Sequence, residues 1–115
     1  MTDKLANSSL GDPARFAQSI VARGELWCDA NAAADLLEET KGTLLAKITK
    51  EHLDQPAWKA EALAKGDERY AEHIKAMVDA RRLANLARVR YDGAKAMGEF
   101  ARSAESTRRA EMSLR

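Results

Sequence analysis

Apolar and small residues recur in alternating steps of three and four along two long stretches of the chain. In the first stretch they are Phe16, Ile20, Trp27, Ala30, Ala34, Leu37, Leu44 and Ile48, with Arg23 and Lys41 filling two further slots. In the second stretch they are His73, Met77, Ala80, Ala84, Ala87, Tyr91, Ala94, Gly98 and Ala101. This spacing places side chains on one face of an α-helix. The pattern therefore predicts two long helices, each with one apolar seam.

Helix start and stop signals divide the chain into three helices. Asp12 and Pro13 are typical of a helix N-terminus, Pro56 stops the first helix, and Gly66 followed by Asp67 separates the last two. The sequence predicts helices over residues 13–53, 56–65 and 67–112. Residues 1–11 lack periodicity and are predicted to form a flexible tail, and residues 12–112 are predicted to form a single domain.

The fold class follows from helix length. A helix over 67–112 would extend for roughly 70 Å, so it needs an equally long partner. The sequence predicts an all-α, coiled-coil-like antiparallel hairpin of two long helices joined by a short one. Facing residues are expected to have numbers that sum to about 121, which places Leu37 opposite Ala84, Ala30 opposite Tyr91, Trp27 opposite Ala94 and Ile20 opposite Ala101.

Further apolar residues lie beside the seams, where a hairpin leaves them uncovered. They are Leu26, Leu36, Leu83, Leu86, Met97 and Phe100. A two-helix hairpin also has little core of its own. We therefore expect these residues to form an oligomer interface, most simply that of a two-fold dimer with a four-helix bundle. In the alternative interpretation they are isolated surface residues with no partner.

Composition fits long helices, since 23 of the 115 residues are alanine and only 5% are aromatic. The net charge of +1 hides an asymmetry: residues 1–55 carry −3 and residues 56–115 carry +4. No apolar run approaches the roughly 18 residues that span a bilayer, and no secretory signal is evident. A cytoplasmic protein without a membrane partner is expected.

Five cations follow the second seam at a spacing of seven residues: Arg81, Arg88, Lys95, Arg102 and Arg109. This basic stripe, with Arg108 beside its end, could bind phosphates or an acidic partner in a salt-dependent way. The alternative is ion pairing between the long helices, with the acids Glu25, Asp29, Asp35 and Glu39. No aromatic residue is expected among the cations to stack on bases.

Other residues give little sign of chemistry. His52 and His73 could approach across the turn, where a polar pair is favoured over a metal clip, and Cys28 is expected to be a small buried residue. Trp58 is expected to plug the open end of the hairpin, or else to anchor a partner. No catalytic residue, metal site or cofactor is predicted, so the chain is not expected to be an enzyme.

The last helix resembles a known group of proteins. Its run YDGAKAMGEFARSAESTRRAEM, ending in STRRAEM, is similar to the C-terminal stretch of small, uncharacterised helical proteins of tailed phages and prophages, some encoded near recombination or replication genes. The resemblance extends more loosely over the first helix, the turn at Glu51 and His52, and the segment YAEH at 70–73. Gly98 and Phe100 depart from the more arginine- and tryptophan-rich helix that such proteins would suggest.

The resemblance implies a phage accessory protein in the cytoplasm of a bacterial host. Together with the patterns, it predicts a non-enzymatic homo-oligomeric helical interaction module that docks on a protein of DNA metabolism or host defence. The alternative function is direct nucleic-acid binding by the basic stripe.

Overall fold

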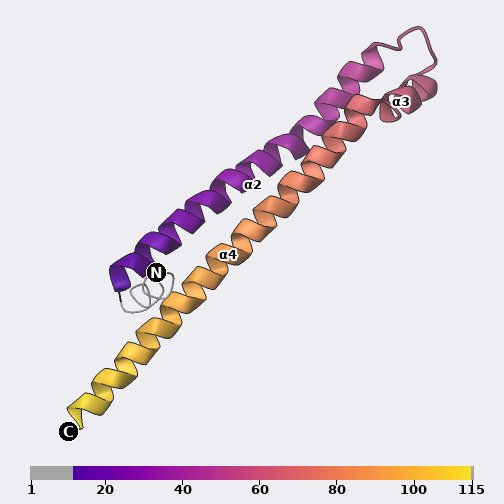
Figure 1. The fold of residues 1–115 in the computed structure, drawn as a ribbon. Coiled ribbons are helices and arrows are strands. Elements are labelled where there is room, and N and C mark those ends of the chain that lie inside the picture. Colours follow the sequence, from indigo (N-terminus) through magenta and orange to yellow (C-terminus); the bar gives the residue numbers. More distant parts are fainter. Residues whose placement is uncertain (1–11, 115) are drawn as a thin grey trace, which may run out of the picture. The chain divides into compact units, whose positions relative to one another are not determined.

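The computed structural model describes residues 12–114 and contains three helices in this part of the chain. They are α2 (Pro13–Lys50), α3 (Ala57–Lys65) and α4 (Glu68–Ser113), and no strand occurs among them (Figure 1). The predicted all-α hairpin with a short connecting helix is therefore confirmed. The predicted tail over residues 1–11 lies outside the described residues.

The predicted helix starts are confirmed by their caps. The Asp12 side chain accepts a hydrogen bond from the Ala14 backbone N–H at 3.0 Å, and Asp67 accepts one from the Arg69 backbone N–H at 2.8 Å. Each carboxylate thus satisfies a backbone donor that has no partner within the helix. Gly66 ends α3 and its N–H bonds the Ala62 carbonyl, as its position predicts.

The first long helix ends earlier than predicted. It stops at Lys50 rather than residue 53, and residues 51–54 form a turn. The N–H groups of Glu51 and His52 bond the carbonyls of Ile48 and Thr49, each at 3.0 Å, in the tighter three-residue spacing. Pro56 disfavours helical backbone only at the residues just before it, so the earlier end of α2 lies beyond its direct effect.

The two seams are confirmed in nearly every slot, because their residues are buried or half-buried and most of their neighbours are exposed. The fully buried side chains are small apart from Ile48: the others are Ala34, Ala60, Ala64 and Ala84. The exception is Arg23, which is exposed, while the half-buried Gly24 takes its slot. A Cβ atom on Gly24 would lie 3.1 Å from Tyr91 Cε1, so glycine makes room for that ring.

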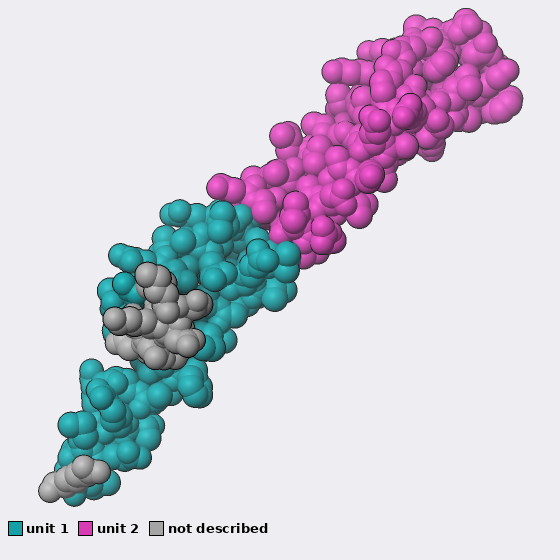
Figure 2. All heavy atoms as spheres, in the orientation of Figure 1, with its two compact units in different colours: residues 1–27, 86–115 teal, residues 28–85 magenta. Residues whose placement is uncertain are grey.

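The described chain divides into two compact units (Figure 2). Unit 2 contains residues 28–85, which include the end of α2, all of α3 and the start of α4. Unit 1 contains the start of α2, up to residue 27, together with α4 from residue 86 onward. Each unit pairs a segment of α2 with a segment of α4, and its seam residues lie between the two segments.

The helix pairing in unit 1 is displaced from the predicted register by about one turn. Tyr91 stacks on Trp27 with ring centroids 5.6 Å apart, although it was expected at the level of Ala30. Likewise, Ile20 Cδ1 lies 3.3 Å from the Cβ position of Gly98, three residues short of Ala101. Facing residues here have numbers that sum to 118 rather than 121. The same sum relates Lys50 to Glu68, the residues where α2 ends and α4 begins, so the early end of α2 accounts for the shift.

Candidate functional site

The predicted oligomer interface is exposed at every one of its six positions. In unit 1 it comprises Leu26, Leu86, Met97 and Phe100, with Phe100 72% exposed; in unit 2 it comprises Leu36 and Leu83, with Leu36 60% exposed. Side chains of this size are normally covered in a folded protein, and clusters of them mark interaction sites more often than single ones do. We call these six residues the apolar face.

Helix geometry places the apolar face and the basic stripe on opposite flanks of each unit. Successive residues are about 100° apart on a helix. Met97 comes one residue before the seam residue Gly98, and Lys95 comes one residue after the seam residue Ala94. The two side chains therefore lie on opposite sides of the seam. In unit 2, the contact between Arg81 and Glu38 shows that the flank of α4 with the basic stripe lies beside the flank of α2 that carries Glu38. Leu36 and Leu83 lie on the other flank of their helices.

Arg81 is the member of the basic stripe that pairs across the helices. Its guanidinium donates to Glu38 Oε1 at 2.8 Å, to Asp35 Oδ1 at 2.6 Å and to Asn31 Oδ1 at 2.7 Å. The hydrogen bond from Arg81 lowers the pKa of the Glu38 carboxyl and is the largest cause of that shift. Ion pairing, with Asp35 as one acceptor, was one of the two interpretations of the stripe and holds at Arg81. The second acceptor is Glu38 rather than Glu39.

Arg88 and Lys95 lie over aromatic rings instead. The Arg88 guanidinium carbon is 5.8 Å from the Trp27 ring centroid, and Lys95 Nζ is 4.8 Å from that of Tyr91. Two aromatic rings therefore do lie beside the cations, which sequence reasoning did not anticipate. For Lys95, the spacing of four residues from Tyr91 along α4 was the available signal; the contact of Arg88 with Trp27 depends on the pairing of α2 with α4. Since the rings stack on each other and carry these cations, they serve as supports rather than as free platforms for bases.

The cations near the end of α4 border an open hollow in unit 1. Its volume is about 560 Å³, and its apolar lining includes Phe16, Ile20 and Ala101. Arg102, Arg108 and Arg109 line it together with Glu105. Glu105 pairs with Arg108 at 2.6 Å and with Arg109 at 3.7 Å along the helix. Within residues 12–114 no carboxylate lies within 4.0 Å of Arg102, so this arginine carries the most available charge of the three.

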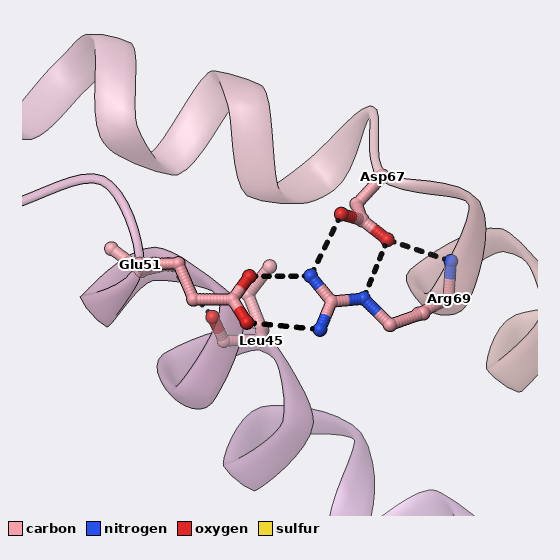
Figure 3. A network of polar contacts seen from close by, with 5 residues as sticks. Leu45, Glu51, Asp67 and Arg69 are labelled. Carbon is pink, nitrogen blue, oxygen red and sulfur yellow. Dashed lines mark hydrogen bonds and ion pairs between the residues drawn. The ribbon is translucent and has the colours of Figure 1, made fainter.

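The turn between the helices is held by Arg69 (Figure 3). Its guanidinium forms a bidentate pair with Glu51, including a 3.0 Å bond from Nη1 to Oε1, and also bonds both carboxylate oxygens of Asp67 at 3.0 Å. These hydrogen bonds lower the pKa values of both Glu51 and Asp67. Sequence reasoning did not identify this clamp, since 18 residues separate Arg69 from Glu51.

Two expectations about single residues were wrong, and a third residue has a contact that the sequence did not indicate. Cys28 is exposed rather than buried, because it lies one residue past the seam position Trp27. Trp58 is 73% exposed and does not plug the hairpin; the buried residues of α3 are Ala60 and Ala64. His73 donates through Nε2 to the Leu37 carbonyl at 2.7 Å, and no cluster of three metal-ligating side chains occurs within residues 12–114.

In the described part of the chain, no helix combines the length and the apolar character needed to cross a membrane. Comparison of the chain with protein-family models, with curated proteins and with solved structures gave no match. The resemblance to phage proteins stays a prediction that rests on the residues of the last helix.

Proposed function

We propose that this protein is a non-enzymatic helical interaction module that self-associates and docks on other proteins. The observation that carries the proposal is the apolar face, whose residues are all exposed and, within each unit, lie on one flank of the helices. The buried residues are few and mostly alanine, so much of the apolar surface that could stabilise the protein lies on the outside. Burying the apolar face against another helical surface would remove this exposed apolar area from water and stabilise the protein.

The proposed partner outside the homo-oligomer is a protein of DNA metabolism or host defence. The resemblance of the last helix to small phage-encoded proteins supports this part of the proposal. The hollow bordered by Arg102, Arg108 and Arg109 favours a partner with acidic groups at the edge of its contact surface. Such rim charges would set the orientation and the rate of association more than the affinity.

Light scattering after size-exclusion chromatography over a range of concentrations tests the proposed self-association. The wild type is expected to elute as a dimer and to dissociate on dilution. Replacing Leu86 and Phe100 together by Gln is expected to give a helical monomer, because both side chains lie on the apolar face. The matched control is Leu53→Gln, since Leu53 is 80% exposed but lies in the turn. A wild type that stays monomeric at every concentration would refute self-association.

A second candidate function, direct nucleic-acid binding, is favoured by one observation. Arg88, Lys95 and Arg102 have no carboxylate of α2 within 4.0 Å among the described residues, so only Arg81 of the predicted stripe is neutralised across the helices. Fluorescence anisotropy with labelled single- and double-stranded oligonucleotides over a salt series tests this candidate. Binding that weakens steeply with salt, and that Arg102→Gln with Arg108→Gln and Arg109→Gln removes, would establish it. Absence of binding at low salt would eliminate it.

A further inference from the structure

Gly93 occupies an exposed helical position in α4 with a negative φ, where a Cβ atom would meet nothing within 4 Å among residues 12–114. Gly42 in α2 shares these properties, but Gly93 differs from it in lying within the apolar face. Within a helix, glycine is the least favourable residue other than proline. Gly24 and Gly98, by contrast, lie in the seam against the side chains of Tyr91 and Ile20.

The surroundings of Gly93 belong to the apolar face. Leu86 and Phe100 lie seven residues before and after it, and Met97 lies one turn further along the helix. Between residues 86 and 100, the outward half of α4 consists of Leu86, Val89, Arg90, Gly93, Ala96, Met97 and Phe100. Arg90 is its single charged residue, although 32% of the chain is charged. Depletion of charge in an exposed apolar strip is typical of the centre of an interface.

We propose that α4 of a second copy of this chain crosses α4 antiparallel at Gly93, with the two-fold axis passing through this residue. The inference rests on the proposed function and specifies the interface within it. Two-fold symmetry about Gly93 brings Leu86 of each copy against the partner's Phe100. The missing Cβ atom at Gly93 lets the two backbones approach closely at the crossing point, which explains a glycine there.

A second copy fits this strip better than an unrelated protein would. The strip is symmetric about its own centre, with a large apolar residue at equal distance on either side of Gly93. Because it is nearly uncharged, two copies meet without repulsion between like charges. The same symmetry places Arg90 opposite the partner's Ala96. The partner's Glu99 lies one helical turn from that alanine, so the positive charge of Arg90 has a negative charge nearby.

Disulfide trapping tests the crossing point directly. In a Cys28→Ser background, Gly93→Cys is oxidised with copper phenanthroline and compared with Gly42→Cys. Gly42 is a matched control, since it is also an exposed helical glycine whose Cβ position has nothing within 4 Å in the described part of the chain. It follows the seam residue Lys41, on the opposite flank from the apolar face. We expect Gly93→Cys to form a covalent dimer at least about ten times faster, because a disulfide needs Cα atoms within roughly 7 Å of each other.

Sedimentation equilibrium on the Leu variants of the same two glycines gives an independent measurement. Leucine favours helix at both positions, so both variants are expected to fold. Gly93→Leu is expected to raise the dimer dissociation constant at least about tenfold through the bulk added at the crossing, and Gly42→Leu is expected to leave it unchanged. A monomeric wild type would overturn both the crossing and the proposed self-association. A wild-type dimer in which cysteines at 93 and 42 crosslink equally fast would overturn the crossing alone.

Discussion

Two arginines make the ion pairs between distant parts of unit 2 within the described residues. Arg69 bonds Glu51 and Asp67 at the turn, while Arg81 bonds Asp35, Glu38 and Asn31 further along the helices. Both guanidiniums face carboxylates in a fork geometry that lysine could not reproduce. Their side chains remain partly exposed, so their main contribution is to fix the turn and the pairing of α2 with α4 rather than to add much stability.

Acid is expected to weaken the Arg69 clamp. The pKa values of Glu51 and Asp67 are lowered from their ordinary values of 4.5 and 3.8, so their stabilising effect is present above those values and is lost as the pH falls through the lower folded values. The melting temperature of the wild type should therefore fall as the pH is lowered below about 4.5. Arg69→Gln should lower it modestly at neutral pH and should reduce its further fall in acid.

Arg82→Gln is the control for that experiment, because Arg82 is exposed and has no carboxylate within 4.0 Å among residues 12–114. Thermal unfolding followed by circular dichroism at several pH values gives the comparison. An acid-dependent fall of the same size in Arg69→Gln and in the wild type would contradict the assigned role of the clamp.

Two glycines of α2 should respond differently to alanine. Gly42→Ala is expected to raise the free energy of unfolding by about 0.5–1 kcal/mol, since nothing lies near its Cβ position and alanine favours helix. Gly24→Ala should bring no such gain, because its Cβ atom would lie 3.1 Å from Tyr91 Cε1 and would displace the ring. Urea unfolding of both variants measures the difference. Equal stabilisation by the two substitutions would show that Tyr91 does not occupy that space.

At the scale of the helices, the sequence was sufficient for most of the fold. The steps of three and four identify both seams, and Asp12, Pro56, Gly66 and Asp67 identify all three helices. These signals are local, acting within one or two turns of the chain. The end of α2 was misplaced because it lies six residues before Pro56, where no local signal in the sequence marks a helix end, and the expected register depended on that boundary.

The details of the candidate site were less predictable because they depend on pairs of residues far apart in the sequence. The clamp of Arg69 on Glu51 and the stacking of Trp27 on Tyr91 require the register to be known within one turn. Cys28 is exposed because it lies about 100° around α2 from the seam residue Trp27, a rotation that one residue decides. The exposure of Trp58 depends on α3, which buries Ala60 and Ala64 instead. By contrast, the six residues of the apolar face were identified correctly as exposed, because their flank follows from periodicity alone.

The seam of small residues leads to a prediction about packing between α2 and α4. Ala34 and Ala84 are both almost completely buried in unit 2. Ala84→Leu is expected to lower the free energy of unfolding by about 1–3 kcal/mol, because the larger side chain would force the helices apart. Ala71→Leu is the control, since Ala71 is exposed on the same helix, and it should change stability little. Chemical denaturation compares the two variants, and a neutral Ala84→Leu would argue against close packing at this layer.

For the whole molecule, the described residues combine a thin core with a large exposed apolar face. The core contains one large buried side chain, Ile48, whereas Leu26, Leu36, Leu83, Leu86, Met97 and Phe100 all remain open to solvent. A protein of this composition gains stability when a second surface covers those residues. The proposed function and the crossing at Gly93 both follow from this imbalance.

Apolar association also predicts a distinctive salt response. Because the strip around Gly93 carries one charge, raising the salt concentration should leave the dimer intact or strengthen it slightly. Association driven by the basic stripe would instead weaken with salt. Repeating the light-scattering series at low and high salt separates the two, and dissociation at high salt would count against the apolar face as the contact surface.

Sedimentation equilibrium of the wild type over a wide concentration range is the most direct test of self-association through the apolar face. Association through the apolar face should give a reversible monomer–dimer equilibrium that shifts toward monomer when Leu86 and Phe100 are replaced by Gln and stays unchanged with Leu53→Gln. A single species with the mass of one chain, 12.7 kDa, at every concentration would contradict it.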